Sequence, residues 1–368
     1  MSSKTKAAIF PYSAPMLPII RHFNDFHQQY SIQDAISWEG TGLCGKDIAF
    51  ACNQPTFGIK VSAPNKDLAP RWDTLLVGCC DLDNSFSSLD IYTYFRKYLD
   101  TDREILFVGG CSENSLEYIT SLCQEYPSNA HQLSFSRGLA YNFVDAQFSP
   151  VSVPIILVGG LASGDEVLEV ILSLKKMFCD DGHTVSCITN SDMGLLLGMH
   201  TFNSIFNNYC LREDEKILHL NQMAREIIAA ERPELLIVEA PDTIMKFADI
   251  APNGFGIRTA MLNLALSPDM LICCMPFDFI SRDYVEVIGK DWREKFGFPL
   301  IGVHVNNAIV DFTAASQSHK VSVIYTNMAL VRDTVANQAQ NCEVPIFNVM
   351  LNGCAGIYQH LQSFFEKD

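Results

Sequence analysis

Short apolar runs alternate with amphipathic segments along the second half of the chain, and this order restricts the fold more than any other feature. The runs with strand character cover residues 155–158, 184–188, 235–239, 270–274, 300–305, 321–325 and 344–347. The segments with helical spacing cover residues 165–179, 214–230, 282–295, 328–341 and 355–366. Strands separated by helices imply right-handed crossovers and a parallel sheet. We therefore predict a doubly wound α/β domain over residues 151–368, with ligands at the carboxyl ends of its strands.

The first part of the chain shows the same alternation less clearly. Apolar runs at residues 7–10, 75–78 and 105–108 have the composition of buried parallel strands, and residues 87–99 and 113–125 have helical spacing. Residues 40–70 fit neither pattern, and residues 131–154 lead to the next domain. We predict a Rossmann-like or flavodoxin-like α/β domain over residues 1–150.

A glycine turn joins the first strand of the second domain to its first helix. Gly159 and Gly164 are separated by four residues, so strand, turn and helix follow the order of a P-loop. A working P-loop continues with Lys and Ser or Thr, which hold the phosphates and Mg²⁺, whereas this chain has Asp165 and Glu166. Two carboxylates repel a triphosphate, so we predict a degenerate P-loop that does not hydrolyse nucleotides.

The same turn is a candidate surface for another ligand or for a partner. Its backbone amides could hold a small anion or a peptide carboxylate, although the two acids oppose this. The plainer alternative is a tight turn whose acidic residues complement the helix dipole. The candidate residues of the turn are Gly159, Gly160, Ser163, Gly164, Asp165 and Glu166.

Five more candidate residues follow later strands. Glu239 ends an apolar run and Asp242 follows it, as the Mg²⁺-binding carboxylate of a Walker B segment would. Phe255 lies between two glycines, which favours an exposed aromatic side chain, and Arg258 could bind a carboxylate or phosphate with both of its terminal nitrogens. His304 is a titratable residue at the end of the run 300–305. The plainer alternative is that parallel strands simply end in polar loops.

Composition excludes several classes of partner. A formal net charge of −16 disfavours nucleic acid and anionic membrane surfaces, both of which select basic proteins. No apolar run reaches the roughly 20 residues that a membrane helix needs. We expect a cytoplasmic protein that binds neither nucleic acid nor membrane.

Thirteen cysteines are scattered along the chain without any C-x₂-C spacing, so zinc ribbons and thioredoxin-like motifs are not indicated. Cys273 and Cys274 could offer thiols to a soft metal, but neighbours on a strand point to opposite faces. We expect reduced cysteines that act as small apolar residues, and neither a metal nor another cofactor.

Residues from about 150 onward resemble a known family of peptide maturation system proteins. The segments that carry the resemblance are residues 158–161, 166–178, 181–186, 232–235, 255–257 and 267–269. Before residue 150, only Pro11-Tyr12-Ser13 after the first strand is similar. The family accompanies radical SAM maturases of Cys-rich ribosomal peptides in clostridial-type bacteria. The resemblance implies an accessory protein that binds the Cys-rich precursor peptide, the radical SAM maturase or both, and it implies no catalytic residues.

Two other functions stay open at this point. One is an enzyme with an unusual nucleotide or metal site formed by Asp165, Glu166, Glu239 and Asp242. The other is a subunit that packs through an apolar face in a homodimer.

Overall fold

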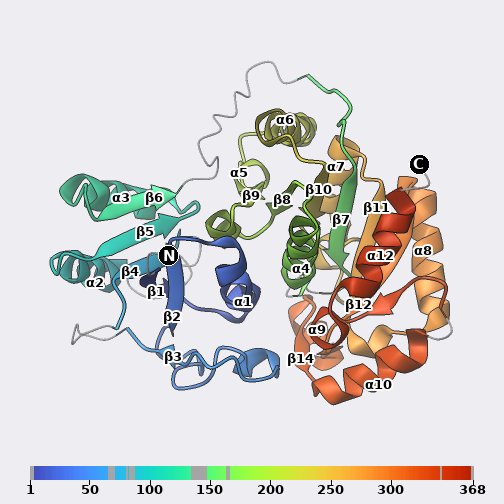
Figure 1. The fold of residues 1–368 in the computed structure, drawn as a ribbon, viewed down its shortest axis with the longest axis horizontal. Helices are drawn as coiled ribbons and strands as arrows, with labels where there is room; N and C mark the ends of the chain where they lie inside the picture. Colours follow the sequence, from blue (N-terminus) through green and yellow to red (C-terminus); the bar gives the residue numbers. More distant parts are fainter. Residues whose placement is uncertain are drawn as a thin grey trace. The chain divides into compact units, whose positions relative to one another are not determined.

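The computed structural model describes residues 4–64, 71–79, 82, 88–133, 147–162, 166–339 and 342–365. The chain forms two compact units, Met1–Gly138 with Ser191–Ser204, and Leu139–Asn190 with Ile205–Asp368. Each unit has a sheet of parallel strands flanked by helices (Figure 1). The predicted fold class, two doubly wound α/β domains, is confirmed.

The sheet of the first unit has the strand order β3-β2-β1-β4-β5-β6, and every strand pair in it is parallel. This is the strand order of a Rossmann sheet. The elements are β1 (Thr5–Phe10), η1 (Ala14–Met16), α1 (Leu17–Phe26), β2 (Tyr30–Ile36), η2 (Phe50–Cys52), β3 (Val61–Ser62), β4 (Thr74–Gly78), α2 (Ser88–Leu99), β5 (Glu104–Val108), α3 (Glu113–Glu125) and β6 (Ala130–Leu133).

Aromatic side chains fill the core of the first unit. Phe95 of α2 packs edge-on against Phe10 of β1 and Phe107 of β5, with ring centroids 6.1 and 5.4 Å apart. All three are fully buried. Because the central strands are covered by helices, their residues form continuous apolar runs, and for this reason the sequence predicts them.

Within the second unit the sheet has the order β15-β12-β11-β7-β10-β8, again with parallel pairs throughout. Its strands are β7 (Ile155–Gly160), β8 (Val185–Thr189), β10 (Leu235–Glu239), β11 (Met270–Met275), β12 (Leu300–Val305) and β15 (Ile346–Phe347). Its longer helices are α4 (Val167–Asp180), α6 (Glu213–Glu231), α7 (Ile257–Leu266), α8 (Arg282–Phe296), α10 (Met328–Ala339) and α12 (Ala355–Phe365). Shorter elements are η5 (Asn253–Gly256), η6 (Phe277–Phe279), β13 (Ala308–Val310), α9 (Phe312–Ser318), β14 (Val323–Tyr325) and α11 (Val349–Asn352).

Helices approach the second sheet closely where it has glycines. Gly302 of β12 faces Ile357 of α12, and α12 packs against α4 (Figure 1). Gly159 of β7 lies on the opposite face, next to Ala240 and Ile244. The sheet is therefore covered on both faces.

One predicted strand has a different role. Residues 321–325 were expected to belong to the parallel sheet, but β14 pairs antiparallel with β13 in a separate two-stranded sheet. Val310 pairs with Val323, and Ile324 is 57% exposed. A short hairpin needs only local pairing, so an apolar run of this length does not show which sheet it joins.

The division between units also differs from the predicted boundary at residue 150. The first unit ends at Gly138, and it includes η4 (Asp192–Leu197) and β9 (His200–Thr201) from much later in the chain; α5 (Asn203–Phe206) crosses the next division. Asp192 explains this grouping, because its carboxylate accepts the N–H of Gly110 at 3.2 Å. No local sequence pattern signals such a contact between distant residues.

The close packing of Gly159 gives a testable prediction. A Cβ at this position would lie 2.5 Å from Ile244 Cγ2 and 2.7 Å from Ala240 Cβ. We expect Gly159→Ala to lower the free energy of unfolding by about 1–3 kcal/mol through overpacking, as measured by urea denaturation. The control is Gly289→Ala in α8, where the nearest atom would be 3.5 Å away. It should leave stability unchanged or raise it by about 0.5–1 kcal/mol. Equal stability of Gly159→Ala and the native chain would contradict this packing.

Candidate functional site

The parallel register brings three distant residues together at the carboxyl ends of the strands in the second unit. Cys274 of β11 pairs with Gly160 of β7 on one side and with His304 of β12 on the other. Glu239 of β10 pairs with Val158, two residues before Gly160. Residues two apart on a strand point to the same face. Glu239, Cys274 and His304 therefore share the face on which α4 begins.

Glu166 immediately precedes α4, and its carboxylate points into the protein. Its Oε2 lies 2.6 Å from His304 Nε2, and the two side chains are 5% and 0% exposed. The N–H of Val349 donates to His304 Nδ1 at 3.4 Å, so the ring proton is on Nε2. His304 thus donates this hydrogen bond to Glu166, whose side chain lies at the N-terminus of α4, an end that favours negative charge.

This arrangement corrects two predictions. We expected Glu166 to face an approaching ligand in the turn and His304 to be a separate candidate, whereas each is the other's buried partner. Ser163, Gly164 and Asp165 lie outside the described residues.

Glu239 is also committed to an internal bond. Its Oε2 accepts hydrogen bonds from the hydroxyl of Thr189 and from the N–H of Asn190, the latter at 2.9 Å. The residue is 8% exposed, and burial raises the pKa of its carboxyl despite these two bonds. The expected Walker-B-like role needs an oxygen that faces the turn, but this oxygen anchors the end of β8.

Cys274 lies among these acids without the properties of a nucleophile. Burial, followed by the nearby Cys273, Glu166 and Glu239, raises the pKa of its thiol well above the ordinary value. Only the thiolate reacts readily, so Cys274 is a packing residue. None of the twelve cysteines in the described part of the chain forms a disulfide bond.

Asp242, the other candidate metal ligand, caps α7. Its carboxylate accepts the N–H groups of Arg258 and Thr259 at 3.1 and 3.0 Å, and the Thr259 hydroxyl at 2.6 Å. Burial raises the pKa of this carboxyl. These bonds satisfy donors at the helix N-terminus and give Asp242 a structural role.

The loop before α7 presents Phe255 to solvent. Gly254, Phe255 and Gly256 have φ values of 75°, 60° and 69°, and the left-handed backbone explains the glycines on either side. Asn253 attaches this loop to the end of β7 by donating to the carbonyl of Ala162 at 2.6 Å. Phe255 is 57% exposed, as the sequence predicts.

The Arg258 side chain, which was a candidate for binding an anion, also contacts an aromatic ring. Its guanidinium carbon is 5.5 Å from the centroid of the Phe206 ring, which is within the range of a cation–π contact. Gly159 and Gly160 likewise have packing roles, since Gly160 accepts the N–H of Ile244 at 3.0 Å.

Further aromatic residues follow the strands near Phe255. The Phe279 ring lies 5.3 Å from Phe247 and 6.1 Å from Phe312 between centroids. Lys246, next to Phe247, lies 6.0 Å from the ring of Phe255. Phe312 is 48% exposed. We call Phe247, Phe255, Phe279 and Phe312 the aromatic surface.

Sequence reasoning missed the partners of the predicted residues. Thr189 and Asn190 directly follow the apolar part of β8, so polar residues at the strand end were the available signal. Asn348 was also missed: it is fully buried and donates to the carbonyl of Val305 at 2.7 Å. Its neighbours gave no comparable signal.

In the described part of the chain, no three His, Cys, Asp or Glu side chains form a group that could hold a metal ion. None of the helices in this part of the chain is both long enough and apolar enough to cross a membrane.

Comparison with known proteins supports the fold. No family model matches the sequence, and no curated protein matches it. Among solved structures, a DUF1611 family protein from Anabaena variabilis ATCC 29413 has a TM-score of 0.62 at 12% identity, over 98% of this chain and 100% of that one. A GTPase from Pyrococcus abyssi in its apo form has a TM-score of 0.24 at 8% identity, over 45% of this chain and 70% of that one. The first match extends the α/β fold assignment to nearly the whole chain.

Burial of Glu239 predicts a pH-dependent stability. A carboxyl whose pKa is higher in the folded state binds its proton more tightly there, so stability falls as pH rises above the unfolded value of about 4.3. Glu239→Gln cannot ionise, so its stability relative to the native chain should rise by about 1–3 kcal/mol between about pH 4 and pH 8.

The measurement is urea denaturation of both proteins across this pH range. Glu294→Gln is the control, because the Glu294 side chain is 65% exposed. Its difference from the native chain should stay constant with pH. If the difference in free energy of unfolding between Glu239→Gln and the native chain stayed constant with pH, this would contradict a raised pKa of Glu239 in the folded state.

Proposed function

We propose that this chain is a non-hydrolytic accessory protein in the maturation of a ribosomally synthesised Cys-rich peptide. It binds the precursor peptide, a radical SAM maturase or both. The observation that carries the proposal is the bond between Glu166 and His304, which places a buried carboxylate where a P-loop would receive phosphates. The identity of the partners rests on the sequence resemblance described above.

Electrostatics argue against a nucleotide at this turn. A triphosphate above α4 would approach the ionised Glu166 in a poorly hydrated environment, where repulsion between like charges is strong. The hydrogen bond with His304 holds this carboxyl group in place. Glu239, the second candidate acid, is bonded to Thr189.

The aromatic surface is the best candidate for partner binding. Phe247, Phe255 and Phe279 follow the carboxyl ends of β10 and β11, where doubly wound proteins usually recognise ligands, and Phe312 follows β13 of the separate hairpin. Phe255 and Phe312 are about half exposed, and Ile257, two residues after Phe255, is 59% exposed. Exposed aromatic and aliphatic groups gathered in this way are typical of protein interaction sites. The nearby Lys246 and Arg258 add cationic groups that can bind the carboxylates of a partner.

Partner binding gives the main test of the proposal. We expect the purified chain to bind a radical SAM peptide maturase or its short Cys-rich precursor peptide, measured by biolayer interferometry. Phe255→Ser and Phe312→Ser should each weaken binding by about tenfold, as loss of an aromatic contact typically does. Leu116→Ser, a change at a 43% exposed residue of the first unit, is the control and should bind normally.

Two results would contradict the proposal. One is the absence of any binding to either partner by the native chain. The other is equal binding by the native chain and both Phe variants, which would exclude the aromatic surface. Sedimentation of the native chain and both variants tests the homodimer alternative, which predicts that the Phe variants dissociate a dimer.

Nucleotide binding is the test that separates this proposal from the enzyme alternative. We expect ATP and GTP, each with Mg²⁺, to give no binding heat in calorimetry and no phosphate release, because Glu166 repels them. Saturable binding with turnover would support a nucleotide-dependent enzyme and refute the accessory role.

A further inference from the structure

A cavity of about 550 Å³ opens at the amino ends of β7, β10 and β11. This is the edge of the sheet opposite to Glu239 and His304. The volume is in the range of sites that hold small organic ligands. Neither the candidate site nor the aromatic surface includes any residue of this cavity.

Aromatic rings form the apolar part of the cavity wall. Phe178 comes from α4, and Phe364 and Phe365 come from the last turn of α12. Phe178 is held in place by the edge of the Tyr358 ring, with centroids 4.7 Å apart and planes at 71°. The wall on this side therefore offers π surfaces to a ligand.

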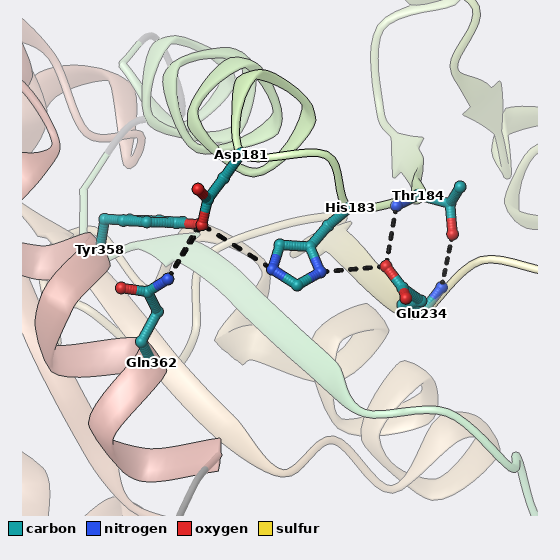
Figure 2. A network of polar contacts seen from close by, with 6 residues as sticks. All are labelled: Asp181, His183, Thr184, Glu234, Tyr358 and Gln362. Carbon is teal, nitrogen blue, oxygen red and sulfur yellow. Dashed lines mark hydrogen bonds and ion pairs between the residues drawn. The ribbon is translucent and has the colours of Figure 1, made fainter.

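The carboxylates of Glu234 and Asp269 belong to the polar part of the wall. Figure 2 shows the polar contacts that fix Glu234 and the neighbouring Asp181. Glu234 accepts the N–H of Thr184 and pairs with His183 Nδ1, both at 3.0 Å. On the other side of the imidazole, His183 Nε2 lies 3.9 Å from Asp181, which accepts the hydroxyl of Tyr358 at 2.5 Å. These bonds orient both carboxylates before any ligand arrives.

The cavity has an excess of negative charge. Asp269 is the second carboxylate of the wall, and it is fixed by the N–H of Ile155 at 2.7 Å. Among the described residues that line the cavity there is no Lys or Arg. Even a protonated His183 would leave a net negative charge from Glu234 and Asp269.

The pKa shifts of Glu234 and Tyr358 agree with a negatively charged cavity. The N–H of Thr184, and then the hydrogen bond from His183, lower the pKa of Glu234, so this carboxylate stays ionised near neutral pH. Burial and the bond to Asp181 raise the pKa of Tyr358 to about 12, so its hydroxyl remains a donor to Asp181.

We propose that this cavity binds an organic cation, a primary ammonium group carried on an aromatic body. The ammonium group would lie near Glu234 and Asp269, and the aromatic body would lie against Phe178, Phe364 and Phe365. Cations are attracted both to carboxylates and to the faces of aromatic rings, and this cavity offers both groups together. An anion would meet only repulsion here.

Three probes of the same shape test the proposal by calorimetry at neutral pH. Tryptamine carries the ammonium group, tryptophol is its neutral counterpart and indole-3-propionate is its anionic counterpart. We expect tryptamine to bind with a Kd below about 1 mM, tryptophol to bind about tenfold more weakly, and indole-3-propionate to give no heat.

Variants assign the binding to this cavity. Glu234→Gln keeps an oxygen for the Thr184 N–H but removes the charge, and it should weaken tryptamine binding about fivefold. Phe365→Leu, which keeps an apolar side chain but removes the π face, should also weaken it. Glu294→Gln is the control, because the Glu294 and Glu234 side chains are 65% and 61% exposed, and it should bind normally.

Three outcomes would overturn the proposal. The first is the absence of binding heat from tryptamine up to about 5 mM, a range that covers weak fragment affinity. Tryptophol binding as tightly as tryptamine would remove the role of charge. Equal tryptamine affinity of Glu234→Gln, Glu294→Gln and the native chain would place the binding elsewhere.

Discussion

The hydrogen bond between Glu166 and His304 determines what the carboxyl edge of the second sheet can accept. It joins the start of α4 to the end of β12, and it is fully withdrawn from solvent. Breaking such a pair leaves a buried charge without compensation, at a cost of about 3–5 kcal/mol. The fold therefore keeps the carboxylate in place, and the helix N-terminus that could attract a phosphate is already neutralised from within.

Much of the fold is predictable because strands covered on both faces form continuous apolar runs, as in β7 and β11. The exceptions have identifiable causes. α7 was missed because it starts after a loop with left-handed residues and has no polar first-turn pattern of its own, its cap being the distant Asp242. Strand β14 has the length and composition of a sheet strand, but pairing with β13 is decided by proximity in the chain. The grouping of Asp192 with Gly110 depends on tertiary contacts alone.

The candidate site was predictable by position but not by partner. Glu239 and His304 are polar residues at strand ends, and parallel topology places such ends on one edge. Their partners depend on which strands are neighbours: Thr189 reaches Glu239 because β8 lies beside β10, an order that no sequence pattern shows. His183 and Glu234 precede β8 and β10 at the amino edge of the sheet. Because ligands of parallel sheets are expected at the carboxyl ends of the strands, no residue of the amino edge was predicted.

The two edges of the second sheet differ in how they use their carboxylates, and this difference bears on function. At the carboxyl edge, Glu166 and Glu239 are buried and bonded to other side chains, so little polar chemistry is left for a substrate. The described residues exposed near this edge include Phe255 and Phe312 and also the charged Lys246. Apolar contact at this edge is the basis of the proposed binding of a peptide or a protein. The topology alone does not decide this, because function depends on the site and not on the fold.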